Sequence, residues 1–335
     1  MKYQGPAPEG DIKPCTGILL TNLGTPDSTT VADVRRYLKE FLSDPRVVET
    51  PRLIWWPVLH GIILRTRPKR SAAAYRKIWT GEGSPLLVHS ERLAIHLQEM
   101  LEERIEGRVK VVLAMRYGNP SIADGLEKLR TANAQRLIIL PLYPQYSATT
   151  TASTFDAISE TLRRWRWMPQ FRFITHYHDD PGYIRALANS VRTFWQQQGE
   201  PDRLLFSFHG IPQDYAEAGD PYPEECMATG ELLARELGLE QKKWAVTFQS
   251  RMGPKEWIKP YTNKTLKQWG KEGAGKVHAL CPGFPADCLE TIEEMGKENR
   301  DHYLSAGGQE YHYIPALNDD RDHVNALADL ILKQG

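Results

Sequence analysis

The chain has few cysteines, no long apolar run and no excess of charge of either sign. Its 335 residues include only four cysteines, too few for the disulfide framework of a small secreted domain. No apolar run reaches the roughly 18–20 residues that span a bilayer, and the opening sequence MKYQGPAPEG lacks the apolar core of a secretory signal. We therefore expect a cytoplasmic protein with reduced thiols.

The charges of the chain sum to zero, with 42 Lys and Arg against 42 Asp and Glu. A nucleic-acid binder normally carries a basic excess, so we expect no nucleic-acid partner. The zero sum conceals two opposed segments: residues 50–81 hold seven Lys or Arg and no acid, whereas residues 285–335 hold eleven acids and four Lys or Arg. The basic segment suits an anionic ligand or lipid, and the acidic one suits a cation or is simply a solvated helix surface.

Several signatures of cofactor and nucleophile sites are also missing. TGEGSP at 80–85 lacks the GK[ST] ending of a P-loop, and there is no GxGxxG, so we expect no nucleotide cofactor. Cys281 and Cys288 form no CxxC pair, and we expect no iron–sulfur cluster. The G-x-S-x-G turn of a hydrolase is absent as well. We expect no prosthetic group.

What the sequence does contain is a repeated alternation of short apolar runs with amphipathic helical patterns. Strands are expected at 17–24, 110–118, 135–144, 171–177, 203–210, 243–250, 276–284 and 311–317. This alternation predicts the α/β class, with parallel sheets flanked by helices, and it runs twice with a changeover near residue 147. In such sheets, ligand sites lie beyond the carboxyl ends of the strands.

One segment departs from the alternation. Residues 53–64, LIWWPVLHGIIL, are apolar, and basic residues precede and follow them. The segment is too short to span a membrane, but tryptophans beside a basic flank suit the headgroup interface. We expect either a lip that covers a ligand or touches a membrane, or a buried segment between helices.

Two motifs at strand ends bring acid–base groups. SFHGIP places His209 at the end of an apolar strand, where it can exchange protons near neutral pH or bind Fe(II), or be merely structural. DCLETIEE places Asp287, Glu290 and Glu294 on one face of an expected helix, with Glu293 off that face and solvated. Such a row suits a proton relay or cation passage, and solvated helices show the same spacing.

Other strand ends carry hydroxyl, basic and aromatic side chains. YPQYSATTT contains Ser147 at a helix N-terminus, which favours an anion such as a carboxylate or an ordinary cap. MRYGNP adds Arg116 and Tyr117, and FQSRMGPKEW adds Gln249, Ser250 and Trp257.

Taken together, these motifs resemble those of the ferrochelatase family. The matching pieces run in order along nearly the whole chain: LTNLGTP, YRKIWTGEGSPL, MRYGNP, PLYPQYSATTT, SFHGIP, GDPYP, FQSRMGP and CPGFPADCLET. The similarity is strongest to the shorter proteobacterial enzymes without an iron–sulfur cluster. The resemblance implies two Rossmann-like, chelatase-type domains with an active-site cleft between them. We expect residues 14–147 with the C-terminal helix 318–335 in the first domain, including a lip at 50–70, and residues 148–317 in the second.

The resemblance also implies an activity and a set of roles. It implies a lyase that inserts the substrate Fe(II) into protoporphyrin IX, releasing protohaem and two protons. His209 and Glu290 are expected to bind metal or accept protons, and Glu294 to extend the path. Porphyrin contacts are expected from Tyr75, Arg65, Arg67, Arg116, Tyr117, Ser147 and Trp257.

Some positions depart from the family pattern. Cys288 stands where many members have histidine, and Leu23 where others have Met or Tyr. The cysteine-rich C-terminal extension of the animal enzymes is absent, so we expect a monomer. Peripheral contact with the inner face of a membrane is expected through residues 53–64. The alternatives are a chelatase for another tetrapyrrole or metal, such as coproporphyrin or cobalt, and a non-catalytic tetrapyrrole carrier.

Overall fold

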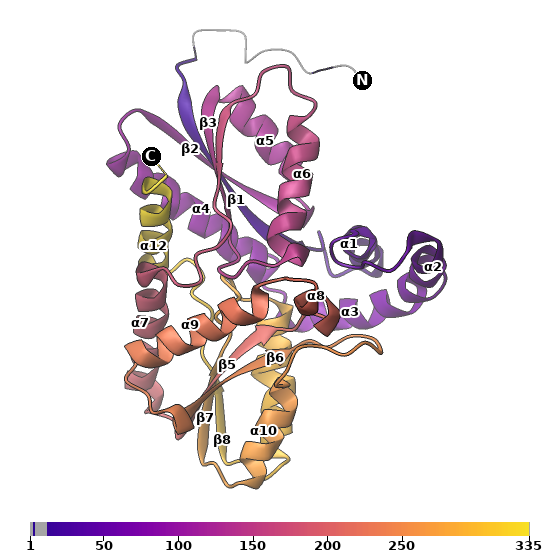
Figure 1. Ribbon diagram of the computed structural model, residues 1–335, viewed down its shortest axis with the longest axis vertical. Helices are drawn as coiled ribbons and strands as arrows, with labels where there is room; N and C mark the ends of the chain where they lie inside the picture. The colour runs from indigo at the N-terminus through magenta and orange to yellow at the C-terminus, as the bar shows by residue number, and fades with distance from the viewer. Residues whose placement is uncertain (1–2, 4–11, 335) are drawn as a thin grey trace. The chain divides into compact units, whose positions relative to one another are not determined.

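The computed structural model describes residue 3 and residues 12–334. The opening segment, from which the absence of a secretory signal was inferred, thus lies almost entirely outside the described residues. The chain forms two compact units (Figure 1). Unit 1 comprises the described residues up to Leu142 together with 147–175 and 327–334, and unit 2 comprises 143–146 and 176–326.

Unit 1 is built on a parallel sheet in the order β2-β1-β3-β4. Its strands are β1 (Cys15–Thr25), β2 (Arg108–Gly118), β3 (Ala134–Pro141) and β4 (Gln170–Phe173). Its helices are α1 (Val31–Ser43), α2 (Arg52–Val58), η1 (Leu59–Ile63), α3 (Leu64–Ile78), α4 (Pro85–Arg104), α5 (Ile122–Thr131), η2 (Ala148–Ala152) and α6 (Ser153–Leu162). Elements η1 and η2 are short π-helices.

Helices cover both faces of the unit 1 sheet, as parallel strands require. Alternate strand residues such as Leu19 and Leu137 pack with α5 and α6 into one buried cluster. The α5 helix approaches very closely, because a Cβ at Gly125 would lie 2.9 Å from the side chains of both Leu19 and Ala114. The opposite face lies against α4 (Figure 1).

Unit 2 repeats this plan with a parallel sheet in the order β6-β5-β7-β8. Its strands are β5 (Arg203–His209), β6 (Trp244–Gln249), β7 (Lys276–Leu280) and β8 (Glu310–Tyr313). Its helices are α7 (Pro181–Gln198), α8 (Gln213–Glu217), α9 (Tyr222–Glu236), η3 (Gln241–Lys243), α10 (Thr262–Lys271), η4 (Glu290–Asn299) and α11 (Arg300–Leu304). The last helix, α12 (Arg321–Leu332), begins in unit 2 and ends in unit 1.

The two sheets share one topology: each has its first strand between the second and the third. The second strand thus lies on one side of the first strand, and the third strand lies on the other side. Such a reversal of strand order creates a switch point at the carboxyl end of the first strand. In unit 2 this switch point is the end of β5, where His209 stands. The core of unit 2 includes Leu205 and Val277, which pack against Leu266 of α10 and Met295 of η4.

The parallel α/β class and all eight predicted strands are confirmed. The changeover between the units falls elsewhere than expected, because β4 pairs with β3 and so brings residues 147–175 into unit 1. The helix that was expected to carry Asp287, Glu290 and Glu294 begins only at Glu290 and opens as a ten-residue π-helix. Among the described residues, none of the helices combines the length and the apolar composition that crossing a bilayer requires.

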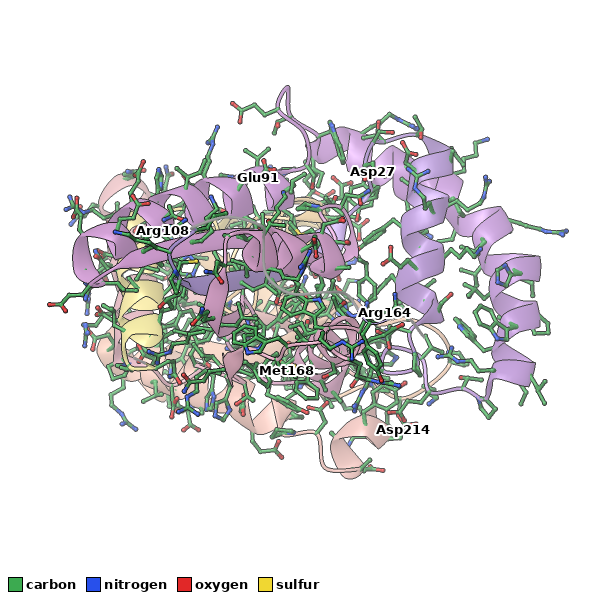
Figure 2. The ribbon with its side chains drawn as sticks, turned by 90° about the horizontal axis from the view of Figure 1, so that it is seen from above. Asp27, Glu91, Arg108, Arg164, Met168 and Asp214 are labelled. Carbon is green, nitrogen blue, oxygen red and sulfur yellow. The ribbon has the colours of Figure 1, made fainter. Side chains whose placement is uncertain are left out.

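Charged side chains are directed mainly to the outside of each unit. Glu91 on α4 and Arg108 at the start of β2 are exposed and mark this outer surface in Figure 2. The exposed apolar side chains include a group on α2 and η1, with Leu53 at 92% exposure, Ile54 at 62% and Ile62 at 59%. The alternative prediction, a buried segment between helices, is wrong for α2, which has no buried residue.

Candidate active site

The side chain of His209 lies at the end of β5, where the strand leaves the sheet. Its ring Nδ1 is 2.6 Å from the carbonyl oxygen of Gly210. A carbonyl only accepts hydrogen bonds, so Nδ1 carries a proton, and in the neutral form of the ring Nε2 is the lone-pair nitrogen. Half-buried at the switch point, His209 is thus held in the tautomer that can accept a proton or bind a metal through Nε2.

The indole of Trp257 supports this histidine. The two ring centroids are 6.2 Å apart, and the Trp257 Nε1–H donates to the carbonyl of Met252 at 2.9 Å. A Cβ at Gly210 would lie 3.1 Å from the indole, so the turn after His209 fits closely against it. Trp257 is only 8% exposed, and in the structure its side chain supports His209. Its contact with a porphyrin ring stays a prediction.

A π-helix presents the two candidate carboxylates. Glu290 is the first residue of η4 and Glu294 lies four residues on. A π-helix takes more residues per turn than an α-helix, so residues four apart lie more nearly one above the other, and such helices are frequent at functional sites. The local geometry therefore aligns Glu290 and Glu294 more closely than the α-helix that the sequence predicted.

A buried polar network fixes the start of this helix to the sheet. The Gln249 side chain donates through Nε2 to the carbonyl of Glu290 at 3.0 Å and accepts from the Ser207 hydroxyl at 2.6 Å. Ser207 Oγ is in turn 2.8 Å from the Thr262 hydroxyl. Gln249, which the sequence placed only at a strand end, is therefore a positioning residue that ties β5, β6 and η4 together.

The carboxylate of Glu294 is bound by a strained residue, Ser250. The Ser250 N–H donates to Glu294 Oε1 at 2.8 Å and its hydroxyl donates to Oε2. Ser250 has φ of 65°, in the left-handed region that non-glycine residues rarely adopt. Strain of this kind persists where surrounding contacts impose it, and here it aims both donors of Ser250 at one carboxylate.

The pKa of Glu294 is raised above its ordinary value, and burial is the main cause. Hydrogen bonds from Ser250 and the nearby His209 lower this pKa, and the like charge of Glu290 raises it. His209 and Glu290 therefore lie close enough to Glu294 to influence its ionisation. A carboxyl group with a raised pKa can accept and return protons closer to neutral pH.

The raised pKa of Glu294 predicts a pH-dependent gain of stability in Glu294→Gln. The unfolded chain ionises this group near pH 4.3, whereas the folded chain ionises it at a higher pH, so above about pH 4.3 the unfolded state binds fewer protons. The free energy of unfolding of the unsubstituted chain is thereby lowered as pH rises through the raised pKa. We expect urea unfolding to show Glu294→Gln gaining stability relative to the unsubstituted chain between pH 4 and pH 7.

The matched control for this experiment is Glu298→Gln, because Glu298 lies on the same helix and is exposed. Its stability relative to the unsubstituted chain should not change over that pH range. A relative stability of Glu294→Gln that falls as pH rises would contradict the raised pKa.

Two other acidic residues lie in surroundings that differ from the predicted ones. Asp287 precedes the helix and is not part of the carboxylate row, because it is buried and accepts from Thr291, Tyr313 and Asn318 at 2.8–2.9 Å. Glu293 was expected to be solvated, but it is 5% exposed and lies 3.3 Å from the Lys297 ammonium. The predicted row therefore reduces to Glu290 and Glu294.

The departure at Cys288 adds no reactive group to the site. The thiol is fully buried, and burial raises its pKa well above its ordinary value. A neutral, buried thiol is a poor metal ligand and a poor base. Leu23, the other departure, lies at the carboxyl end of β1 in unit 1 and is partly exposed.

In unit 1, Arg116 and Tyr117 belong to a buried polar cluster that is centred on Asp44. The Asp44 carboxylate accepts from Arg116 Nη2 at 2.5 Å, from the Tyr117 hydroxyl at 2.8 Å and from Ser153 Oγ at 2.6 Å. Burial raises the pKa of Asp44, but these donors and the Arg46 N–H outweigh it, so the pKa is lowered overall. The expected porphyrin contact of Tyr117 is not supported, because its side chain is fully buried within this cluster.

The remaining predicted porphyrin contacts lie elsewhere in unit 1. Ser147 is the N-cap of η2 and accepts from the Thr149 N–H at 3.2 Å, so its capping role is confirmed. Tyr75 is buried on α3, where its ring forms a T-shaped pair with that of Trp79 at a centroid distance of 6.2 Å. Arg65 is exposed and Arg67 half-buried on α3, and Arg65 lines a pocket of about 520 Å³ with Arg35, Lys39 and His60.

Comparison with solved structures finds proteins with a similar fold. SirB from Bacillus subtilis with Fe3+ matches with a TM-score of 0.55 over 95% of both chains, at 13% sequence identity. CbiX, described as the terminal enzyme for biosynthesis of siroheme in denitrifying bacteria, matches with a TM-score of 0.51 over 95% of this chain and 98% of that one, at 14% identity. This chain therefore shares its fold, two parallel α/β units of the same strand order, with these two proteins.

Sequence comparison identifies the family to which the chain belongs. The Ferrochelatase family model matches residues 15–335. A ferrochelatase of Thioalkalivibrio sulfidiphilus is 59% identical, covering 95% of this chain and 86% of the relative, and one of Hydrogenovibrio crunogenus is 54% identical, covering 96% and 86%. This chain belongs to the ferrochelatase family.

Proposed function

We propose that this chain inserts Fe(II) into protoporphyrin IX and releases protohaem and two protons. The observation that carries the proposal is the arrangement around His209, a lone-pair Nε2 at the switch point of unit 2 beside a carboxyl group of raised pKa. Membership of the ferrochelatase family supports the same reaction. In this proposal Fe(II) is a substrate, and no prosthetic group takes part.

The protein groups supply places for the protons and for the incoming cation. A free porphyrin loses two pyrrole protons as the metal enters, and the metal loses its water. His209 Nε2 accepts a proton in the tautomer that the Gly210 carbonyl fixes. Glu290 and Glu294 provide negative charge that attracts the cation, and Glu294 accepts a proton that His209 would pass on.

A substrate comparison tests the proposal. The purified chain is given Fe(II) or Co(II), each with protoporphyrin or coproporphyrin, without oxygen, and metalloporphyrin is followed by absorption. We expect the highest kcat/KM with Fe(II) and protoporphyrin. A preference for coproporphyrin or for cobalt would support a chelatase for another tetrapyrrole or metal. Porphyrin binding without metal insertion would support a non-catalytic carrier.

We further propose that α2 and η1 form a lip that touches an anionic membrane surface. Trp55 anchors α2, because its Nε1–H donates to the carbonyl of Leu42 in α1 at 2.7 Å. Trp56, in contrast, is 39% exposed and packs on the ring of His60 at a centroid distance of 5.2 Å. With the exposed Leu53 and Ile54 it forms an apolar edge beside the basic pocket that Arg65 lines.

The lip predicts a specific loss of membrane binding in the triple variant Leu53→Ser, Ile54→Ser and Trp56→Ser. Full burial of one such side chain contributes about 1.5–3 kcal/mol, so even partial burial of three should give at least a tenfold loss. The measurement is flotation with vesicles that contain anionic phospholipid. Trp55 is left intact because its contact with α1 is structural.

The matched control removes apolar side chains that are similarly exposed outside the lip, with Trp167→Ser and Met168→Ser. This control should float like the unsubstituted chain. Equal flotation of the triple variant and the control would rule out the lip as the membrane contact.

A further inference from the structure

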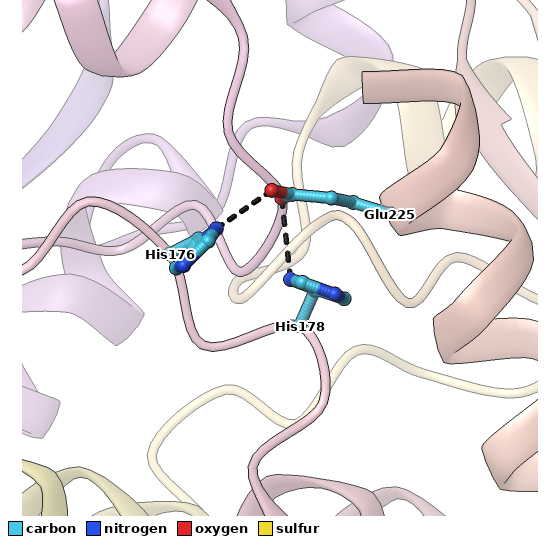
Figure 3. Close-up of side chains that lie close together, drawn as sticks. All are labelled: His176, His178 and Glu225. Carbon is cyan, nitrogen blue, oxygen red and sulfur yellow. Dashed lines mark hydrogen bonds and ion pairs between the residues drawn. The ribbon is translucent and has the colours of Figure 1, made fainter. Parts of the chain in front are cut away.

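A second group of metal-ligating side chains lies in unit 2, away from the elements that carry His209 and Glu290. His176 and His178 come from the loop between β4 and α7, and Glu225 comes from the first turn of α9. One ligand atom from each of these residues lies within 4.8 Å of the others. Figure 3 shows the two imidazoles reaching the same carboxylate from different directions.

Each oxygen of the Glu225 carboxylate faces a different imidazole. His176 Nδ1 is 2.6 Å from Oε1, and His178 Nδ1 is 3.3 Å from Oε2. The Tyr146 N–H also donates to Oε2 at 2.7 Å.

The backbone around the three residues is held in place. Thr229 Oγ1 lies 2.9 Å from the carbonyl of His178 and 3.0 Å from that of Glu225, and so joins the loop to α9. Between the histidines, the Tyr177 N–H donates to the carbonyl of Pro144 at 2.9 Å. Side chains that project from such a fixed frame are preorganised for a ligand, which lowers the entropy cost of binding.

The burial of the three residues suits a site that opens on one side. The side chain of Glu225 is 9% exposed, that of His178 13% and that of His176 48%. Within the part of the chain that the structure describes, buried His178 Nδ1 has no hydrogen-bond partner, although a carboxylate oxygen lies 3.3 Å away. A nitrogen that is buried and left without a hydrogen bond is costly unless another interaction satisfies it.

We propose that His176, His178 and Glu225 bind a divalent first-row transition cation such as Zn²⁺, Co²⁺ or Fe²⁺. Two imidazoles and one carboxylate are a donor set that these ions favour, and the set leaves coordination positions open to water. Bonds of about 2.0–2.1 Å at a tetrahedral ion place neighbouring ligand atoms about 3.3 Å apart. His178 and Glu225 already have that separation, whereas His176 Nδ1, at 2.6 Å from the carboxylate, has to move outward, which its half-exposed side chain allows.

This second site does not depend on the insertion reaction. Its ligands come from the loop before α7 and from α9, whereas the insertion site is built on β5, β6 and η4. Its test therefore uses metal alone, with no porphyrin present, so that its failure is distinct from a failure of the proposed function.

The experiment titrates Co²⁺ into the full chain after treatment with a chelator, in a His209→Ala background that removes the other candidate imidazole. Visible absorption bands of Co²⁺ report imidazole coordination. We expect about one Co²⁺ per chain with these bands, and at least tenfold weaker binding in His176→Ala with His178→Ala. Glu225→Gln, which keeps the acceptor for the Tyr146 N–H, should weaken binding to a similar extent.

The control removes two other histidines, with His96→Ala on α4 and His302→Ala on α11, and should bind Co²⁺ like the background chain. Zn²⁺ should raise the unfolding midpoint of the background chain and of this control, and leave that of the His176/His178 variant unchanged. Equal Co²⁺ affinity in all chains, or no binding up to about 1 mM Co²⁺, would overturn the proposal and leave a hydrogen-bonded cluster only.

Discussion

Replacing His209 by Ala is expected to slow Fe(II) insertion into protoporphyrin by at least about 100-fold, because a positioned proton acceptor contributes about 10²–10⁴ to a rate. The Gly210 carbonyl fixes the Nδ1 proton, so Nε2 is the atom lost from the reaction. The ring projects from the end of a strand and packs on Trp257, so its removal should leave the sheet intact. The loss should fall on kcat, measured by absorption of the metalloporphyrin.

The control for this prediction is His302→Ala, a partly exposed histidine of α11, which should keep the full rate. Protoporphyrin binding, followed by its fluorescence, should survive in both variants. Glu290→Gln should lose a similar factor, since it removes one of the two aligned carboxylates. A His209→Ala chain that turns over within tenfold of the unsubstituted rate would remove this residue from the proposed chemistry.

The second large effect is on folding, in Asp44→Ala. The side chain of Asp44 is 3% exposed and that of Arg116 is 17% exposed, so the substitution leaves a largely buried guanidinium without its carboxylate. Breaking a buried ion pair from one side costs about 3–5 kcal/mol. We expect a loss of that order in the free energy of unfolding, measured with urea.

The comparison for Asp44 is Asp156→Ala, which removes an exposed carboxylate 2.8 Å from Arg46. Exposed pairs contribute about 0–1 kcal/mol, so this variant should remain close to the unsubstituted chain. The lowered pKa of Asp44 adds a pH dependence. Its stabilisation is complete above the unfolded pKa of about 3.9 and is lost as pH falls through the lower folded value. Similar losses in the two variants would contradict a structural role for the Asp44 cluster.

Much of the fold could be predicted from the sequence because parallel strands are short, apolar and regularly spaced. GILLTNLG in β1 and RLLFSFHG in β5 are of this kind, and both lie in the middle of their sheets. The unit boundary could not be predicted, because the pattern of FRFITHY does not say which sheet it joins. The pairing of Arg136 with Gln170 decides that question, and it depends on contacts distant in sequence.

The candidate site was predictable only in part. The strand-end rule found His209, Gln249 and Ser250, since it depends on topology alone. It could not find the π-helix, whose extra residue per turn leaves no pattern in ETIEEMGKEN. The rule also could not show that Asp287 is bound by Tyr313 and Asn318, which lie 26 and 31 residues further along the chain.

The role of Arg116 shows the same limit in unit 1. Its place at the end of β2 suggested a free cation for a propionate, but Asp44, 72 residues earlier, neutralises it. The only sequence signal for Asp44 was a carboxylate just after an amphipathic helix, which is common on solvated surfaces. Arg65, exposed on α3 in a basic pocket, is the better candidate for an anionic group.

Iron insertion by His209 and Glu290 is tested by an experiment that follows iron and protons together. The purified chain is mixed without oxygen with Fe(II) and protoporphyrin in a weakly buffered solution that contains a pH indicator, and haem and proton release are recorded in the same sample. We expect catalytic haem formation with two protons released per haem, and loss of both signals in the double variant His209→Ala with Glu290→Gln. Porphyrin that binds but is not metallated, or undiminished turnover in the double variant, would contradict it.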